Sequence, residues 1–126
     1  MPVAATLQTA ASSRPLAALR ATVLEHLFQS WRGRSGRRYI CSVHPITDEA
    51  AFDCDRAVVA AVRQTPKGSE IAFVFQPAAA GGDFSLWAER ARRCGARALH
   101  VHLLADTPDA RAAVAADLRP APLFAI

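Results

Sequence analysis

Four arginines gather within seven residues of this chain, in the segment 31–38, which reads Trp-Arg-Gly-Arg-Ser-Gly-Arg-Arg. A planar guanidinium group binds phosphate oxygens through paired hydrogen bonds, and glycines let a backbone approach a polyanion closely. A second basic cluster follows at 90–97. If both clusters share one face, they form a nucleic-acid footprint for DNA or RNA. The residues predicted to bind are Arg32, Arg34, Arg37, Arg38, Arg90 and Arg93; the alternative is a solvated surface in an arginine-rich chain.

Three histidines could supply metal-ligand chemistry. His100 and His102 are two residues apart, so they share one face of an extended strand, and His44 ends another strand-like run. Imidazole nitrogens bind zinc, and convergence of the three rings would create a site. The competing interpretation is that each ring has an ordinary hydrogen-bond partner in the core. We therefore treat these three residues only as weak metal candidates, and we expect no cofactor.

The cysteines and the overall composition favour one globular domain in a reducing compartment. The chain has 126 residues, 52% of them hydrophobic and 21% charged, enough to build a core without disulfides. Its three cysteines are widely spaced and lack the paired spacing of zinc sites. No apolar run approaches the length of about 18 residues that a membrane helix needs. We expect a cytoplasmic protein without a membrane partner, composed of a flexible arm at 1–12 and a single domain at 13–126.

The elements that must position these residues follow from hydrophobic spacing. Apolar residues at helical spacing predict a helix from about residue 13 to Trp31, so that the basic segment would be a loop after this helix. Two further helices are predicted by their caps, one from Asp83 to Gly95 and one from Thr107 to Pro120. Strand-like runs occupy 38–44, 57–63, 70–76 and 98–104, and the middle two form a hairpin through the turn at 65–69.

The predicted element order is therefore α-β-β-β-α-β-α. We expect an α+β sandwich in which the first three strands form an antiparallel meander, a fourth strand joins them, and the helices pack on the sheet. The opening order is similar to that of restriction-endonuclease-like enzymes, and also of double-stranded-RNA-binding domains, in topology alone. The nuclease resemblance implies an acid before the second strand, which Asp53 or Asp55 supplies, and an acid-x-Lys on the third. Glu70-Ile71-Ala72 lacks that lysine, so the resemblance implies a catalytically degenerate domain.

A partner protein is the competing hypothesis for function. Residues 14–38 carry six arginines and one glutamate, whereas residues 48–56 carry four acids and one arginine. Such asymmetry, together with apolar residues on both faces of the hairpin, suits a homodimer or an accessory subunit as well as a polyanion. No nucleophile elbow or phosphate loop is present. The sequence thus favours a small non-enzymatic domain that binds nucleic acid, with a protein-interaction role as the alternative.

Overall fold

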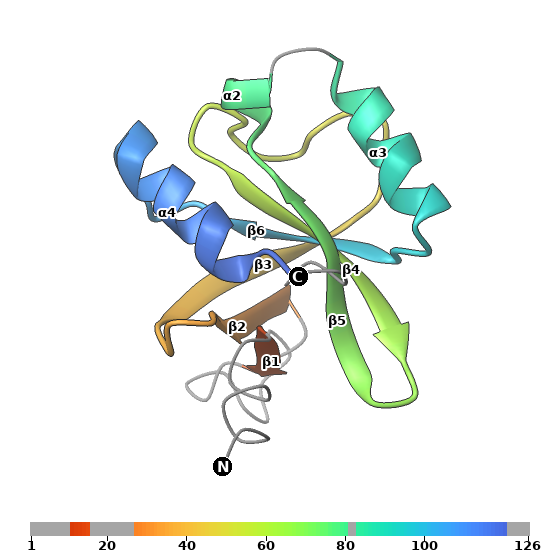
Figure 1. Cartoon of the computed structure of the whole chain (residues 1–126). Coiled ribbons are helices and arrows are strands. Elements are labelled where there is room, and N and C mark those ends of the chain that lie inside the picture. Colours follow the sequence, from red (N-terminus) through yellow and green to blue (C-terminus); the bar gives the residue numbers. More distant parts are fainter. Residues whose placement is uncertain (1–10, 16–26, 81–82, 121–126) are drawn as a thin grey trace, which may run out of the picture.

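The computed structural model describes residues 11–15, 27–80 and 83–120 (Figure 1). These residues form six strands and three helices. The strands are β1 Ser12–Pro15, β2 Phe28–Arg32, β3 Arg38–Pro45, β4 Val58–Thr65, β5 Gly68–Phe75 and β6 Ala98–His102. The helices are α2 Pro77–Ala80, α3 Phe84–Arg93 and α4 Pro108–Leu118. None of the helices in the described ranges is long and apolar enough to cross a membrane.

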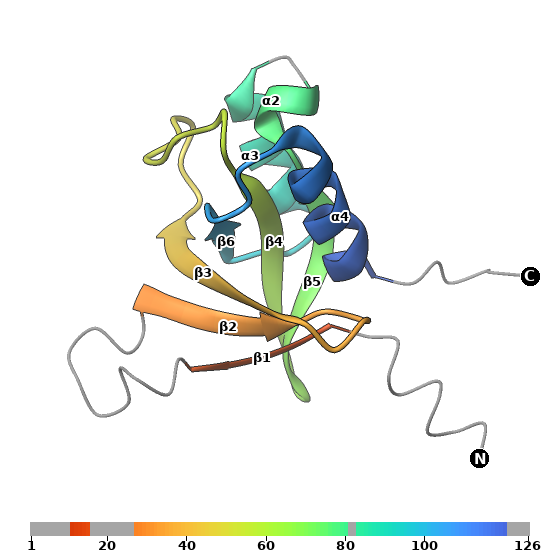
Figure 2. The same ribbon diagram turned by 90° about the vertical axis from the view of Figure 1, so that its left-hand side faces the viewer.

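The strands form one antiparallel sheet in the order β1-β2-β3-β6-β4-β5. The sheet curls so strongly that the edge strand β1 comes close to the other edge strand, β5. Figure 2 shows β1 and β2 running across the lower part of the long β4–β5 hairpin. The result is a half-barrel with a concave inner face and a convex outer face, which we use below as names for the two sides of the sheet.

The predicted three-stranded meander is wrong, and with it the α-β-β-β-α-β-α sandwich. Strand β6 lies between β3 and β4, because Val101 pairs with Ser42 on one side and with Val59 on the other. Runs adjacent in sequence often pair, but the connection between Pro45 and Val58 is long enough for β4 to lie one position further away. The order on which the nuclease and RNA-binding resemblances rest is therefore absent.

The predicted first helix is also wrong where the structure describes it. Phe28–Arg32 is a strand, and Ser12–Pro15 is a second strand that pairs with it, whereas residues 16–26 lie outside the described ranges. Trp31 lies on strand β2 opposite Tyr39 of β3, and its side chain is fully buried while that of the next residue, Arg32, is exposed. Contacts with distant strands thus override the local helical spacing. Most of the predicted arm, residues 1–10, also lies outside the described ranges.

The remaining predicted elements are confirmed. The β4–β5 hairpin turns at Gly68, whose φ of 116° is one that glycine adopts without strain. Asp83 caps α3 by accepting a hydrogen bond from the Ser85 amide. Thr107 caps α4 through the Ala110 amide, with Pro108 in the first turn.

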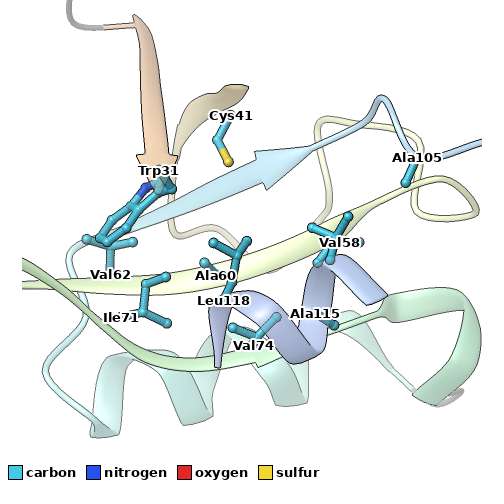
Figure 3. Close-up of a cluster of buried hydrophobic side chains, with 11 residues drawn as sticks. Trp31, Cys41, Val58, Ala60, Val62, Ile71, Val74, Ala105, Ala115 and Leu118 are labelled. Atoms are coloured by element: carbon cyan, nitrogen blue, oxygen red, sulfur yellow. The ribbon is translucent and has the colours of Figure 1, made fainter. Parts of the chain in front are cut away.

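Two apolar clusters lie on the two faces of the sheet. On the inner face, side chains of β2, β3, β4 and β5 pack against α4, as Figure 3 shows for Trp31, Ala60 and Leu118. On the outer face, residues of β4, β5 and β6 pack against α3, with Val59 and Val101 at the centre. The β4–β5–β6 end of the sheet is thus covered on both sides.

Candidate functional site

The basic segment is the turn of a hairpin between β2 and β3. The Gly33 amide donates to the Arg37 carbonyl at 2.8 Å, and the Gly36 amide donates to the Gly33 carbonyl at 3.0 Å. Gly36 has a φ of 93°, a conformation that side-chain-bearing residues rarely adopt. The segment is therefore an ordered hairpin turn instead of a loop that follows a helix. The hydrogen bonds of the turn fix the backbone positions of its arginines.

Asp117 near the end of α4 holds this turn. Its carboxylate accepts hydrogen bonds from the Ser35 amide at 2.8 Å, the Ser35 hydroxyl at 2.6 Å and the Tyr39 hydroxyl at 2.7 Å. Burial opposes ionisation of Asp117, but the hydrogen bonds from Ser35 and Tyr39 outweigh it, so the pKa of Asp117 lies below its ordinary value. A Cβ added to Gly33 would collide with this carboxylate, so a larger residue there would displace the Asp117 side chain from its place in the turn.

Arg34 turns back onto the protein. Its Nη2 atom donates to the Ala116 carbonyl at 2.7 Å, and its backbone amide donates to the Asp117 carbonyl at 3.0 Å. A cation at the end of a helix is favourable because the last carbonyls carry partial negative charge. Arg34, predicted as a phosphate ligand, thus contacts the end of α4 through one guanidinium nitrogen.

Three other arginines lie together on the outer face, and we call them the arginine row: Arg14, Arg32 and Arg38. Arg32 and Arg38 are direct cross-strand partners, and Arg14 lies on the same face of the adjacent strand β1. All three are exposed. The pKa of Arg38 is lowered by partial desolvation and by the positive charges of Arg14 and Arg32. The ion pairs found in the described part of the chain involve other arginines, namely Arg56, Arg63, Arg92 and Arg93.

The second predicted cluster, on α3, lies elsewhere. Figure 1 shows α3 at the opposite end of the sheet from β1 and β2. Arg93 pairs with Glu89 at 2.8 Å, one helical turn away. The Arg90 guanidinium lies 5.4 Å from the centre of the Phe73 ring and 5.6 Å from that of Trp87. Arg90 and Arg93 therefore do not share a surface with the arginine row. The row includes Arg14, which the sequence analysis predicts to lie in a helix.

The three candidate histidines do not converge. His100 and His102 lie on the inner face, where His100 Nδ1 accepts from Trp31 Nε1 at 2.8 Å and His102 Nδ1 lies 2.8 Å from the Ile40 carbonyl. His44 lies on the outer face against Phe52. Burial, with a smaller effect of His44, lowers the pKa of His100 to about 4, so its ring is neutral at pH 7. Within the described ranges, no cluster of three or more metal-ligating side chains exists.

A serine–histidine contact escaped the sequence reasoning. Ser42 Oγ lies 2.8 Å from His44 Nε2, and His44 borders a small cavity of about 70 Å³ together with Phe52 and Phe84. Residues two apart on a strand share a face, so the signal was present in the spacing. Burial lowers the pKa of His44 and favours the neutral ring. The Ser42 hydroxyl also donates to the Val101 carbonyl at 3.4 Å, which ties it to the neighbouring strand β6.

The acids of the nuclease resemblance occupy a surface connection. The Asp53 carboxylate accepts a hydrogen bond from the Asp55 amide at 3.0 Å, which shapes the turn before β4. The arginine row and the Asp117-held turn next to it are therefore the features of the described residues that best fit ligand binding. Comparison with known proteins found no matching family model, no matching curated protein and no matching solved structure.

Proposed function

We propose that this protein binds a nucleic acid through the arginine row on the outer face of β1, β2 and β3. The observation that carries the proposal is the cross-strand pairing of Arg32 with Arg38, with Arg14 adding a third positive charge. Like charges directly opposite each other destabilise an antiparallel pair. A row of phosphates would relieve this repulsion, because each guanidinium group could bind phosphate oxygens through paired hydrogen bonds.

The geometry of the row suits a backbone-binding role. Adjacent strands are about 5 Å apart, so arginines on three neighbouring strands can follow a line of phosphates across the sheet. Beside the arginines this face exposes Ser12 and Ile40, whereas Ser30 is buried, so it provides little for reading base edges. The proposal is therefore binding with weak sequence preference, in which affinity comes from charge neutralisation and counterion release.

Fluorescence anisotropy with labelled single-stranded RNA, single-stranded DNA and duplex DNA tests this function. The variant R14A/R32A/R38A is compared with R90A/R93A/R97A, which removes the same charge from α3 and the turn after it. We expect the first variant to weaken binding about tenfold or more at low salt, and to reduce the slope of log K against log salt by about 2 to 3. The second variant should bind like the unchanged protein.

Two results would count against the proposal. Equal losses in the two variants would mean that net charge alone attracts the nucleic acid. No measurable binding by the unchanged protein at low salt would remove the function altogether. Light scattering on the same samples adds an independent outcome, since a dimer that resists dissociation would favour the protein-interaction hypothesis instead.

The proposed location is the cytoplasm, where nucleic acid is accessible and thiols stay reduced. The three cysteines are free in the structure, with Cys41 buried, Cys54 half-buried and Cys94 exposed. Burial raises the pKa of Cys41 to about 12, which keeps this thiol protonated and unreactive. An exposed free thiol such as Cys94 is typical of a reducing compartment.

A further inference from the structure

We propose that a hollow between the β2–β3 turn and α4 is a binding site for a single phosphate group, and that the Asp117 carboxylate occupies its anion position when no ligand is bound. We call this site the loop hollow; it is lined by Arg34, Ser35, Arg37, Tyr39, Ala113, Ala116 and Asp117. It adjoins the arginine row but uses different side chains. The inference therefore goes beyond the proposed function and can hold if that function fails.

Three hydrogen-bond donors converge on one anion in the loop hollow. The Ser35 amide, the Ser35 hydroxyl and the Tyr39 hydroxyl all point to the Asp117 carboxylate, at 2.8, 2.6 and 2.7 Å. An ionised carboxylate only accepts hydrogen bonds, and so does a fully ionised phosphate. The same three donors could therefore bind phosphate oxygens without rearrangement of the turn.

The charge of the lining also favours an anion. Arg34 and Arg37 contribute two positive charges, and Asp117 is the one acid among the residues that line the hollow. Arg37 is exposed, and its amide donates to the Ser35 hydroxyl at 3.2 Å, which fixes that hydroxyl toward the anion position. Without the Asp117 carboxylate the lining would carry two uncompensated guanidinium groups around three aligned donors.

Asp117 can leave this position without movement of α4. The helix is fixed by its neighbours Ala115 and Leu118, which are 0% and 1% exposed against the sheet. The Asp117 side chain itself is only partly buried, and the hollow of about 640 Å³ is open to solvent beside it. A rotation about its Cα–Cβ bond would expose the three donors, and the cost of that rotation would weaken phosphate binding by the unchanged protein.

A purely structural role for Asp117 makes the opposite prediction. If the carboxylate only holds the turn, its removal should loosen the turn and weaken any anion binding there. If it occupies a phosphate site, the substitution Asp117→Asn should strengthen phosphate binding, because asparagine keeps the size of the side chain but removes the competing charge. The sign of the change in affinity therefore separates the two roles.

The experiment is a titration of the full chain with inorganic phosphate and pyrophosphate, followed by the backbone amide signals of Ser35 and Gly36 in ¹⁵N-correlated NMR spectra. We expect saturable shifts of these two signals, and an affinity at least about tenfold higher in D117N. Oligonucleotides with and without a 5′ phosphate form a second arm, which distinguishes a terminal phosphate from free phosphate as the ligand. Sodium chloride at matched ionic strength controls for screening.

A second variant keeps the inference falsifiable if D117N folds poorly. Tyr39→Phe removes one donor and retains the ring packing, so we expect it to weaken phosphate binding about threefold to tenfold. The inference is overturned if the Ser35 signal does not move in any variant, or if D117N, with its fold intact by circular dichroism, binds phosphate more weakly than the unchanged protein. Loss of nucleic-acid binding by R14A/R32A/R38A has no bearing on this result.

Discussion

Two hairpins of the same sheet each place an arginine near the turn, but its cross-strand partner has opposite charge in one and like charge in the other. Near the β4–β5 turn, Arg63 faces Glu70 across the strands, and the two side chains form an ion pair at 2.6 Å. Near the β2–β3 turn, Arg32 faces Arg38 instead, and the nearby Arg14 increases the repulsion. The first arrangement is the one that stabilises a hairpin. The second is expected to cost some stability, and it places like charges side by side on the surface.

The helices that pack on the sheet explain why the two hairpins can differ in the charge pairs near their turns. The β4–β5–β6 end packs against α4 on its inner face and against α3 on its outer face. The β1–β2–β3 end contributes Trp31 and Cys41 to the inner core, whereas the arginine row on its outer face is exposed. In the part of the chain that the structure describes, α3 covers only the β4–β5–β6 side of the outer face, and the arginine row lies outside it. The predictions below test this contrast.

The largest effect is expected at Trp31, because this side chain joins the two ends of the sheet. Trp31 belongs to β2, is 0% exposed and donates to His100 of β6 at 2.8 Å. Trp31→Ala should lower the free energy of unfolding by about 3 to 5 kcal/mol, through a large cavity and an unpaired His100 nitrogen. Chemical denaturation measures the loss. Trp31→Phe should cost clearly less, and equal costs would mean that the cavity is not the main cause.

The pH dependence of stability tests the same contact between Trp31 and His100. Burial lowers the pKa of His100 from 6.5 to about 4, so between these pH values the unfolded chain binds a proton that the folded chain does not. Stability is therefore full above about pH 6.5 and declines by about 3 kcal/mol as the pH falls toward 4. His100→Gln should flatten this part of the curve in denaturation experiments from pH 7 to 4.

His44 is the control for that measurement. Burial lowers its pKa in the same direction, so His44→Gln should remove a further part of the decline. Because the charge of His44 contributes to the lowered pKa of His100, the two losses should be somewhat less than additive. A decline that persists in the double variant would assign the pH dependence to other groups.

The two hairpin turns allow a matched glycine test. Gly36 and Gly68 both have positive φ angles, 93° and 116°. Replacing either by alanine should cost about 1 kcal/mol, because an L-residue is strained in this region. Only Gly36→Ala should also weaken anion binding, since the strain then falls in the turn that joins Arg32 to Arg38. If Gly68→Ala lost anion binding to the same extent as Gly36→Ala, the binding site could not be assigned to the β2–β3 hairpin.

The covered end of the sheet is also the end that could be predicted from the sequence. The β4–β5 hairpin and the caps of α3 and α4 follow from signals within a few residues, such as Asp83 before Phe84 or Thr107 before Pro108. The curl and the strand order could not be predicted, because the position of β6 between β3 and β4 depends on pairing between residues about 40 to 60 positions apart.

The candidate site was only half predictable for the same reason. The sequence identified the basic segment, but the roles of its arginines depend on distant partners. Arg34 contacts α4 and Arg32 contacts β3, and only the fold reveals the difference. Arg14 was assigned to a helix because the helical spacing beyond it dominated the local pattern. Asp117 gave no signal at all, since an aspartate inside a predicted helix is ordinarily a solvated residue.

The smallest expected effect comes from exchanging the charge pairs of the two hairpins, which tests the contrast between them most directly. Arg38→Glu converts the β2–β3 pair into the kind found at Arg63 and Glu70, so it should raise the unfolding temperature slightly while it weakens nucleic-acid binding. Glu70→Arg does the reverse in the other hairpin and should destabilise the protein by a similar amount without creating a binding site. Thermal unfolding at low salt, where the charges are least screened, resolves both changes. If Arg38→Glu lowers stability, the arginines of β2 and β3 are already compensated within the chain, and the positive surface has no need of a ligand.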